Sequence, residues 1–521
     1  MDYNLPFEPS EYQRKIFDFV LHGTGNAVVN AKAGSAKTTT MVAAMSMVNP
    51  KLQCMFIAFN KSIAEELSKR TEDKPNCHVT TVHALGLKMI ERNLSNPQLD
   101  EFKYRSYAIK KLASIENSDE SFASNVFRLI DLSRLNLCQT AKEVRKTADE
   151  YGVSILGDEC DVVMECLKWG KENTSTIDYT DMVWLPYELS LVPKGLQYDW
   201  IFLDEGQDFS KAYIQIFLKC FKRGTRFIAV LDERQLINGF AGASKTSVKQ
   251  LFKQPHTVRF ELPISYRCDA KIIREAQKIV SDIQCRDNVP DGDVVYNGTL
   301  DMVKDGDLVL CRYNAPLVKI YAELSKRGLR CRINGGLDTD RLLFMLRMSK
   351  SDNLSIDLDN DGVFRDLYVH MFDIADKVSQ SYSIPFEDAL VTEQVMIIYD
   401  NIKMLEFFAD GWTTKEELIG RIMSLCDNNS DGVLLSTVHR AKGLEADNVF
   451  IAGRSYMPSF MAKTEWELQQ EENLIYVAVT RAKHKLVYLS DETTPSMVTI
   501  GKKDSFLEEV KRIKNKIGWN S

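Results

Sequence analysis

Two short segments of this 521-residue sequence combine residue types that could bind and hydrolyse a nucleoside triphosphate. The first, at 31–38, contains Gly34, Lys37 and Thr38; it follows an apolar run at 27–29 and opens a segment rich in Ala, Met and Val. In a strand, loop and helix of this kind, backbone N–H groups and the positive helix N-terminus face the phosphates. Lys37 would then reach the β- and γ-phosphates, and the Thr38 hydroxyl would bind Mg²⁺.

The second segment, at 204–208, follows another apolar run, at 200–203, and begins with Asp204 and Glu205. Asp204 could hold the metal ion, and Glu205 could orient or deprotonate the attacking water. One phosphate loop alone is moderately specific, but two such segments at the ends of predicted strands are much more so. Together they predict an ATP-hydrolysing protein that uses ATP and Mg²⁺.

Composition limits the class of protein further. At 44% hydrophobic residues the chain can form several domains with real cores, yet it has no apolar run of about eighteen residues that would span a membrane. The first residues lack the basic and apolar regions of a signal peptide, and the eleven scattered cysteines form no C-x-x-C pair. We therefore expect reduced thiols, no zinc site, no membrane partner and a cytoplasmic location, or a nuclear one in a eukaryote.

The net charge of −7 differs from that of a simple basic DNA-coating protein, so nucleic-acid binding would need positive charge concentrated in a groove. Apolar runs alternate with helical stretches, which predicts a parallel sheet in each of two lobes. Strands are expected at 26–31, 54–59, 200–204 and 226–231 in the first lobe, and at 308–310, 331–333, 433–435, 449–451 and 486–488 in the second.

Three further positions have both a functional and an ordinary interpretation. Gln13 could read an adenine edge with its amide, or be a surface glutamine after a helix cap. Phe59, before Asn60 and Lys61, could stack on a nucleic-acid base, or belong to the core. His83 follows the hydroxyl-rich end of another predicted strand, and a lone histidine is usually structural.

The whole series of segments resembles the UvrD/Rep/PcrA group of superfamily 1 DNA helicases, in order, over about residues 9–490. Gln13 matches the glutamine with which the family reads adenine. The segment at 31–38 matches the family motif A-x-A-G-S-G-K-T, the segment at 58–61 matches T-F-T-N-K, and the segment at 81–83 matches T-F-H. Residues 204–208 are similar to its D-E-x-Q-D, and 232–237, which contain Gln235, to its G-D-x-x-Q-x-I. Later, 265–267 resemble N-Y-R, 438–445 resemble L-H-x-A-K-G-L-E, and 476–482 resemble Y-V-A-x-T-R-A.

The resemblance implies an α/β fold of two RecA-like parallel-sheet lobes with the ATP cleft between them, each interrupted by a mainly helical insertion. Lobe one is expected at 1–86 and 176–260, with its insertion at 87–175. Lobe two is expected at 261–336 and 432–492, with an insertion at 337–431 that is shorter than usual for the family. A tail at 493–521 follows, and its mixed charges between 502 and 516 favour a solvated helix over a DNA-binding arm.

Site roles follow from the same resemblance. The expected catalytic residues are Lys37, Asp204, Glu205, Gln235, Arg267 and Arg481, with Thr38 and Asp204 on Mg²⁺. The expected nucleotide-binding residues are Gln13, Ala33, Gly34, Ser35, Ala36, Lys37, Thr38, Thr39, Tyr266 and Glu445. The expected contacts to the DNA strand are Phe59, Asn60, His83, Phe240 and His439. Because Arg267 and Arg481 lie outside the segment that holds Lys37, they can meet the γ-phosphate only if two lobes close over ATP.

Three positions depart from the family pattern. Ala36 replaces the glycine before Lys37, so its Cβ would crowd the phosphates, or strain the backbone if φ must be positive, and could reduce ATP affinity or turnover. Leu231 stands where the family usually has glycine, which suggests a packing change. The family's Y-x-W-R appears here as residues 238–241; Phe240 can still stack on a base, but the missing tyrosine and arginine suggest an altered grip on the strand.

These features predict an ATP-dependent DNA helicase or translocase that moves on single-stranded DNA and acts at single-strand/double-strand junctions in replication, repair or recombination. Its 3′-to-5′ polarity is implied by the resemblance alone, and loading by a partner protein is plausible from the negative net charge. Two alternatives stay open. One is a translocase that strips proteins from DNA with little strand separation, and the other is a DNA-binding scaffold whose ATPase is inactive because of Ala36.

Overall fold

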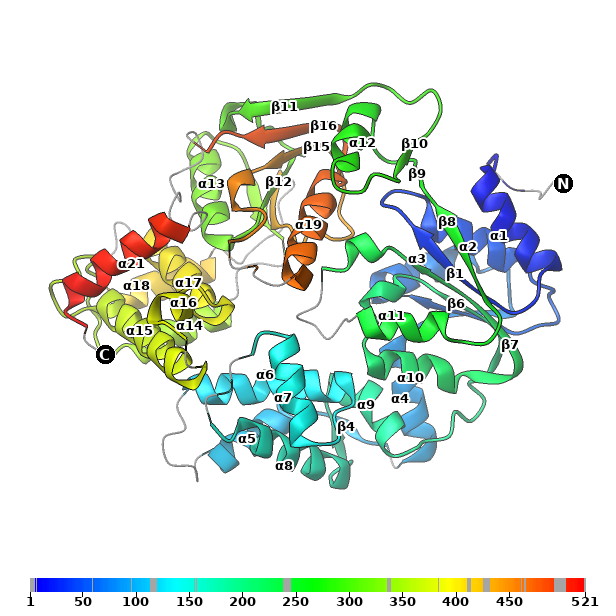
Figure 1. Ribbon diagram of the computed structural model, residues 1–521, viewed down its shortest axis with the longest axis horizontal. Coiled ribbons are helices and arrows are strands. Elements are labelled where there is room, and N and C mark those ends of the chain that lie inside the picture. The colour runs from blue at the N-terminus through cyan, green and yellow to red at the C-terminus, as the bar shows by residue number, and fades with distance from the viewer. Residues whose placement is uncertain are drawn as a thin grey trace. The chain divides into compact units, whose positions relative to one another are not determined.

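The computed structural model describes residues 5, 7–58, 60–94, 96–112, 120–153, 155, 157–237, 245–334, 339–382, 384–409, 414–424, 432–460, 462, 465–491 and 503–519 (Figure 1). The chain divides into two compact units, Met1–Tyr266 and Arg267–Ser521. This division falls shortly after the boundary expected at 260/261, so that Tyr266 and Arg267 belong to different units.

A six-stranded sheet in the order β3-β2-β6-β7-β1-β8 forms the centre of the first unit. Its strands are β1 (Asn26–Ala31), β2 (Cys54–Ala58), β3 (Cys77–Thr81), β6 (Tyr198–Leu203), β7 (Phe221–Leu231) and β8 (Thr257–Leu262). All the strand pairs described in this sheet are parallel, which confirms the predicted fold class. Phe59, expected at the end of the second strand, lies outside the described residues.

Successive residues of a strand point to opposite sides of the sheet, and helices cover both sides, so both faces are buried. Ala27 and Val29 of β1 pack with helices on one face, whereas Val28 packs with helices on the other. The first face is covered by α1 (Glu11–His22), α2 (Lys37–Ser46) and α3 (Lys61–Arg70). The second is covered by α4 (Val82–Asn93), α9 (Tyr179–Glu188), α10 (Lys211–Lys219) and α11 (Lys245–Phe252). The two layers of helices hold the strand ends in fixed positions.

The first insertion is helical, as expected, and has its own hydrophobic core with parts of α4 and α9. It consists of α5 (Lys103–Leu112), α6 (Glu120–Asn136), α7 (Ala141–Glu150) and α8 (Glu159–Glu172), with the short parallel pair β4 (Gln98–Leu99) and β5 (Thr176–Ile177) at its base. These helices, coloured blue to cyan, lie together at the bottom of the view in Figure 1.

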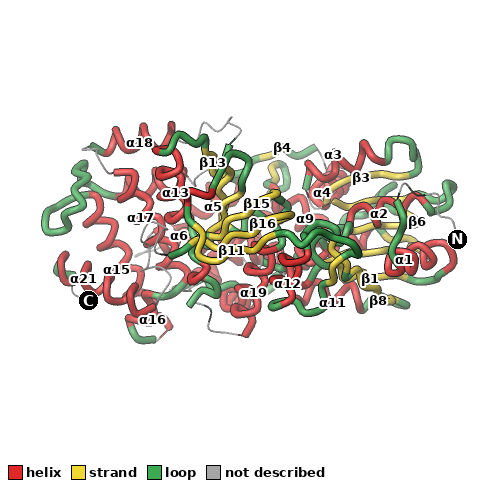
Figure 2. The backbone as a smooth tube through the Cα atoms, turned by 90° about the horizontal axis from the view of Figure 1, so that it is seen from above, coloured by secondary structure: helices red, strands yellow, loops and turns green. Residues whose placement is uncertain are grey.

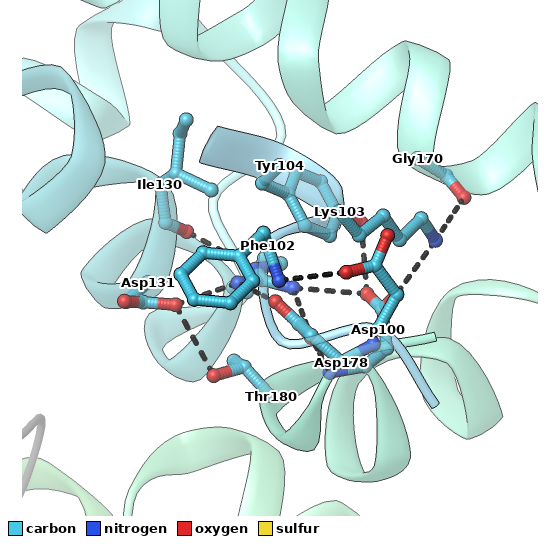
Figure 3. Close-up of polar contacts among 11 residues, drawn as sticks. Asp100, Phe102, Lys103, Tyr104, Ile130, Asp131, Gly170, Asp178 and Thr180 are labelled. Carbon is cyan, nitrogen blue, oxygen red and sulfur yellow. Dashed lines mark hydrogen bonds and ion pairs between the residues drawn. The ribbon is translucent and has the colours of Figure 1, made fainter. Parts of the chain in front are cut away.

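A buried cluster of charges ties this insertion to α9 (Figure 3). Lys103 of α5 pairs with Asp181 at 2.6 Å, and Arg134 of α6 pairs with Asp178 at 2.7 Å and with Asp181 at 3.0 Å. The Tyr104 hydroxyl donates to Asp181 at 2.8 Å, and Lys103 also donates to the carbonyl of Gly170. Every charge in the cluster therefore has a partner, as burial in a hydrophobic insertion requires.

The second unit contains another six-stranded parallel sheet, in the order β11-β16-β15-β12-β14-β13. Its strands are β11 (Asp293–Gly298), β12 (Leu308–Cys311), β13 (Cys331–Ile333), β14 (Val433–Thr437), β15 (Ala446–Ile451) and β16 (Ala482–Leu489). Helices α12 (Ala270–Gln277), α13 (Asn314–Lys326) and α19 (Glu465–Val479) accompany this sheet, and Figure 2 shows its strands in yellow among red helices. The five strands expected for this lobe are all present.

The second insertion is also helical, with α14 (Thr339–Met348), α15 (Val363–Tyr382), α16 (Phe386–Leu390), α17 (Glu393–Ala409) and α18 (Lys415–Ser424). The tail forms a helix, α21 (Lys503–Ile517), but the expectation that this helix is simply solvated was wrong. Phe506 on its buried face packs edge-on against Tyr399 of α17, and Glu509 pairs with Lys403 at 2.8 Å. The tail is thus a structural part of the second insertion. None of the helices in the described part of the chain is long and apolar enough to cross a membrane.

We expect Asp181→Asn to destabilise the first unit by about 3–5 kcal/mol, because it leaves Lys103 and Arg134 buried with less compensating charge. Urea unfolding followed by tryptophan fluorescence measures the change. Asp131→Asn is the matched control: Asp131 also pairs with Arg134, at 2.6 Å, but its side chain is 56% exposed, so the cost should stay below about 1 kcal/mol. Equal losses in the two variants would contradict a stabilising role for the buried cluster.

Candidate active site

The two segments singled out in the sequence lie at the same edge of the first sheet. All the strands run parallel, so the loop after β1 and the residues after β6 both leave from the carboxyl edge, where ligands bind in open α/β sheets. Strand β1 ends at Ala31, and α2 begins at Lys37 after a five-residue loop, 32–36. Strand β6 ends at Leu203, directly before Asp204. Only β7 separates β1 from β6 in the sheet.

Two direct contacts join these segments. The Lys37 ammonium donates to both carboxylate oxygens of Glu205, each at 2.9 Å. The Thr38 hydroxyl donates to Asp204 Oδ2 at 3.0 Å. The Lys37 and Glu205 side chains are only 11% and 20% exposed, so this ion pair is largely shielded from water. The structure therefore brings together the four residues expected to contact phosphate, metal ion and attacking water.

A chain of side-chain hydrogen bonds extends from Glu205 into the sheet. Gln207 donates from Nε2 to Glu205, and its Oε1 accepts from the backbone N–H of Asp232 at 3.0 Å. Asp232 in turn accepts from Gln235 Nε2 at 2.6 Å. Sequence reasoning assigned a role to Gln235 but none to Gln207 or Asp232, although both stand in the segments at 204–208 and 232–237 that it had matched to the family.

Burial and mutual repulsion set the electrostatics of these carboxylates. Burial, reinforced by the charge of Glu205, raises the pKa of Asp204 to about 6, against the attraction of Lys37. Burial likewise raises the pKa of Asp232. Burial disfavours the Lys37 cation, but Glu205, Asp232 and Asp204 together raise the pKa of Lys37. The site thus concentrates negative charge around one lysine, an arrangement that suits a bound cation.

The loop at 32–36 has a geometry that fits a phosphate. Gly34 and Ala36 both have positive φ, 71° and 57°, which curls the backbone at the start of α2. Ser35 is buried, and its hydroxyl makes no hydrogen bond within the described part of the chain. A buried hydroxyl without a partner at a helix N-terminus is a place for a ligand oxygen. Thr38 and Asp204 supply the hard oxygen atoms that Mg²⁺ prefers, so the residues present fit ATP and Mg²⁺.

Other residues expected to bind nucleotide surround this loop in the first unit. Gln13 is buried; its Oε1 accepts from Ser10 N and its Nε2 donates to Thr40 Oγ1 at 2.9 Å, so the amide links the α1 cap to α2. The backbone N–H of Tyr266, just after β9 (Ile264–Ser265), donates to the Gly34 carbonyl at 2.8 Å. Ala33, within the loop itself, is buried, and Thr39 is exposed on the first turn of α2.

The remaining expected catalytic residues belong to the second unit. Arg267 donates to Glu445 Oε2 at 2.7 Å and to the Thr480 carbonyl, and Glu445 also pairs with Lys483 at 3.0 Å. Against the opposing effect of burial, Lys483 and Arg267 lower the pKa of Glu445. Arg481 is buried and donates to the carbonyls of Val477 and Leu444. Arg267, Glu445 and Arg481 are thus gathered around the start of β16.

The residues expected to contact a DNA strand are only partly described, because Phe59 and Phe240 lie outside the described residues. Asn60 is exposed and caps α3 through a hydrogen bond from the Ile63 N–H at 2.9 Å. His83 packs edge-on against Tyr213, and its burial lowers its pKa. Burial first, and then the charge of Arg312, hold the pKa of His439 well below its usual range. Both histidines are therefore neutral at pH 7 and could contact DNA by hydrogen bonding or stacking.

Comparison with known proteins places the chain in a family. Residues 12–256 match the UvrD/REP helicase N-terminal domain, and residues 415–492 match the UvrD-like helicase C-terminal domain. The chain belongs to the UvrD-like helicase family. This is a family of DNA helicases that hydrolyse ATP, and the resemblance drawn from the sequence motifs is confirmed.

Full-length similarity to individual UvrD-like relatives is modest. F-box DNA helicase protein 1 of Schizosaccharomyces pombe is 24% identical over 89% of this chain and 55% of its own length. A probable DNA helicase II homolog of Mycoplasma genitalium is 22% identical over 89% of this chain and 82% of its own length. DNA helicase II of Escherichia coli is 46% identical, but over 70 residues, 13% of this chain and 10% of its own. The chain spans about half the length of the F-box helicases that it matches, 55% and 48% of two of them.

We expect Ala36→Gly to stabilise the first unit by about 0.5–1 kcal/mol. An alanine at φ 57° carries about 1–2 kcal/mol of strain that glycine lacks, partly offset by the greater freedom of glycine in the unfolded chain. Ala44→Gly in the interior of α2 is the control and should cost about 1 kcal/mol or more. Urea unfolding of both variants tests the assignment, and a similar loss in each would show that the backbone at Ala36 carries no strain.

Proposed function

We propose that this protein is an ATP-dependent motor that moves on single-stranded DNA and acts as a DNA helicase. The observation that carries the proposal is the pair of contacts between α2 and the end of β6, Lys37 with Glu205 and Thr38 with Asp204. A lysine and a hydroxyl at a helix N-terminus, facing two adjacent carboxylates, can bind a triphosphate with its metal ion and position water for attack.

The proposed chemistry assigns one task to each group. The loop N–H groups and Lys37 hold the β- and γ-phosphates, and Thr38 with Asp204 would hold Mg²⁺, which when bound neutralises charge on the phosphates. Once Lys37 turns to the phosphates, its hydrogen bonds to Glu205 are released. Glu205 can then accept a proton from water, while Gln207 keeps its carboxylate oriented.

Further residues complete the proposed site in the ATP-bound state. Gln235, held by Asp232, is assigned to sensing the γ-phosphate, and so are Arg267 and Arg481 of the second unit. Arginine at the transferring phosphoryl group stabilises the charge that develops there and is worth orders of magnitude in rate. Gln13 and Tyr266 are assigned to adenine, and Glu445 to the ribose. Gln13 must then exchange its hydrogen bond with Thr40 or with Ser10 for one with the base.

The proposed DNA contacts start from the same edge of the sheet as the ATP site. Strands β2 and β3 run parallel to β1 and β6, and their carboxyl ends lead to Asn60 and His83. A strand of DNA contacted there would share the sheet with the hydrolytic groups, which is a short route for coupling ATP turnover to movement. Aromatic stacking tolerates any base, so we propose sequence-independent binding.

A second candidate function is a translocase that strips proteins from DNA with little strand separation. The observation that favours it is the second insertion, which is shorter than usual for the family. Its α17 is joined to α21 by the ion pair between Lys403 and Glu509 and by the packing of Tyr399 against Phe506. The two functions differ in unwinding of a 3′-tailed duplex relative to the ATPase rate stimulated by single-stranded DNA. Efficient unwinding supports the helicase, and ATPase without unwinding supports the stripping translocase.

Steady-state ATPase with and without single-stranded DNA tests the motor itself. We expect strong stimulation by DNA, and a loss of about 10²-fold or more in Lys37→Ala, because Lys37 is the cation that meets the phosphates. Lys69→Ala, on the exposed side of α3, is the control and should leave activity unchanged. If the natural protein binds DNA but does not hydrolyse ATP, the motor hypothesis is wrong and a scaffold with an inactive ATPase is supported.

A further inference from the structure

Two cysteines lie directly opposite one another in the first sheet. Cys54 opens β2 and Cys77 opens β3, and the parallel register pairs their Cα atoms. Both side chains point to the same face, because Cys77 packs against the core cluster that contains Cys54. Hydrogen bonds fix this register at its first residue: Cys54 N donates to the Asn76 carbonyl, and Asn76 Nδ2 donates to the Leu52 carbonyl, each at 2.8 Å.

The spacing of the strands suits a covalent bond between the two sulfur atoms. Neighbouring strands lie about 4.7–4.9 Å apart, and disulfides join residues whose Cα atoms are about 4.4–6.8 Å apart. Both cysteines are free thiols in the structure. Their Cβ atoms already share a face, so the bond needs side-chain rotation and no strand movement.

The two thiols differ in access. Cys54 is fully buried, whereas Cys77 is half-buried on β3, the strand at the edge of the sheet. A small oxidant in solution can therefore reach the Cys77 thiol before it reaches the buried Cys54 thiol. This is the usual arrangement of an attacking cysteine and a resolving cysteine.

The surroundings of the two thiols also make Cys77 the more reactive one. The neighbouring Cys54 thiol, followed by the charge of Lys74, lowers the pKa of Cys77 against the effect of burial. The Cys77 thiol, together with burial, raises the pKa of Cys54. Cys77 therefore loses its proton more readily than Cys54 does.

We propose that Cys54 and Cys77 form a reversible disulfide, a redox-modification site at the edge of the nucleotide-binding sheet. The oxidant is a peroxide: the Cys77 thiolate attacks one peroxide oxygen and becomes a sulfenic acid, and the O–O bond breaks. The Cys54 sulfur then attacks the Cys77 sulfur, the S–S bond forms, and the sulfenic oxygen leaves as water. Two thiols lose two electrons and two protons, one hydrogen peroxide becomes two waters, and a dithiol reverses the change.

The pair lies at the opposite end of the strands from the proposed DNA contacts and from the ATP site. Cys54 and Cys77 stand at the amino ends of the two strands whose carboxyl ends lead to Asn60 and His83. The disulfide itself is tested by mass and by peptide mapping, so its existence does not depend on the proposed motor function.

The test treats the full-length natural protein with a small molar excess of hydrogen peroxide, then blocks the remaining thiols and maps disulfide-linked peptides by mass spectrometry. We expect the intact mass, measured before the thiols are blocked, to fall by about 2 Da, a linked peptide containing Cys54 and Cys77, and full reversal by dithiothreitol. Cys54→Ser and Cys77→Ser should each abolish the linked peptide. Cys285→Ser is the matched control, because Cys285 is the other half-buried free thiol described, and it should leave the linkage intact.

A second measurement separates a built pair from chance oxidation. At pH 7 and before oxidation, iodoacetamide should modify Cys77 several-fold faster than Cys285, because the pKa of Cys77 is lowered whereas burial raises that of Cys285. Oxidation that links other cysteines, or that takes Cys77 to sulfinic acid with Cys54 still free, would overturn the proposal. Circular dichroism of each serine variant establishes that it is folded before either measurement.

Discussion

One lysine held between carboxylates at the end of a buried sheet is the interaction on which the first unit depends. Lys37 is paired with Glu205, lies in the field of Asp204 and Asp232, and is mostly shielded from water. Charges in such a place are costly unless they compensate one another. The ion pair neutralises the lysine in the free protein. In the proposed function, the phosphates of ATP would take over this task from Glu205.

The architecture serves this arrangement. Because the strands are parallel, β1 and β6 end at the same edge of the sheet, and helices on both faces fix these strand ends. The buried cluster of Lys103, Arg134, Asp178 and Asp181 joins the first insertion to α9. The second unit repeats the parallel sheet and gathers Arg267, Glu445 and Arg481 at the start of β16. Its insertion is closed by α21, so that residues far apart in the chain form one packed body there.

The sequence predicted the buried strands well but missed two of the strands at sheet edges, β8 and β11, for a physical reason. Strands β1, β2, β6 and β12 are buried on both faces and so read as continuous apolar runs. Strands β8 and β11 are edge strands with exposed residues, and no apolar run marked them. The tail misled for the opposite reason: its many charges concealed Phe506, Val510, Ile513 and Ile517, which share the buried face of α21.

The site itself was predictable in its residues but not in its contacts. Residue types at the ends of predicted strands indicated Lys37, Thr38, Asp204 and Glu205, because phosphate chemistry needs those types there. The bond between Lys37 and Glu205, the bridging role of Gln207 and the capping role of Gln13 depend on side-chain positions that only the fold determines. Ala36 is a similar case: the sequence shows that an alanine replaces the glycine, but only the structure shows that its φ is positive.

The most direct measurement of this site is the Mg²⁺-dependent binding of a non-hydrolysable ATP analogue to the natural protein, Lys37→Ala and Glu205→Gln. If Lys37 exchanges Glu205 for the phosphates, Lys37→Ala should lose binding by about tenfold or more, while Glu205→Gln should bind at least as tightly as the natural protein. Equal binding by Lys37→Ala and the natural protein would contradict the assignment of the phosphates to this lysine.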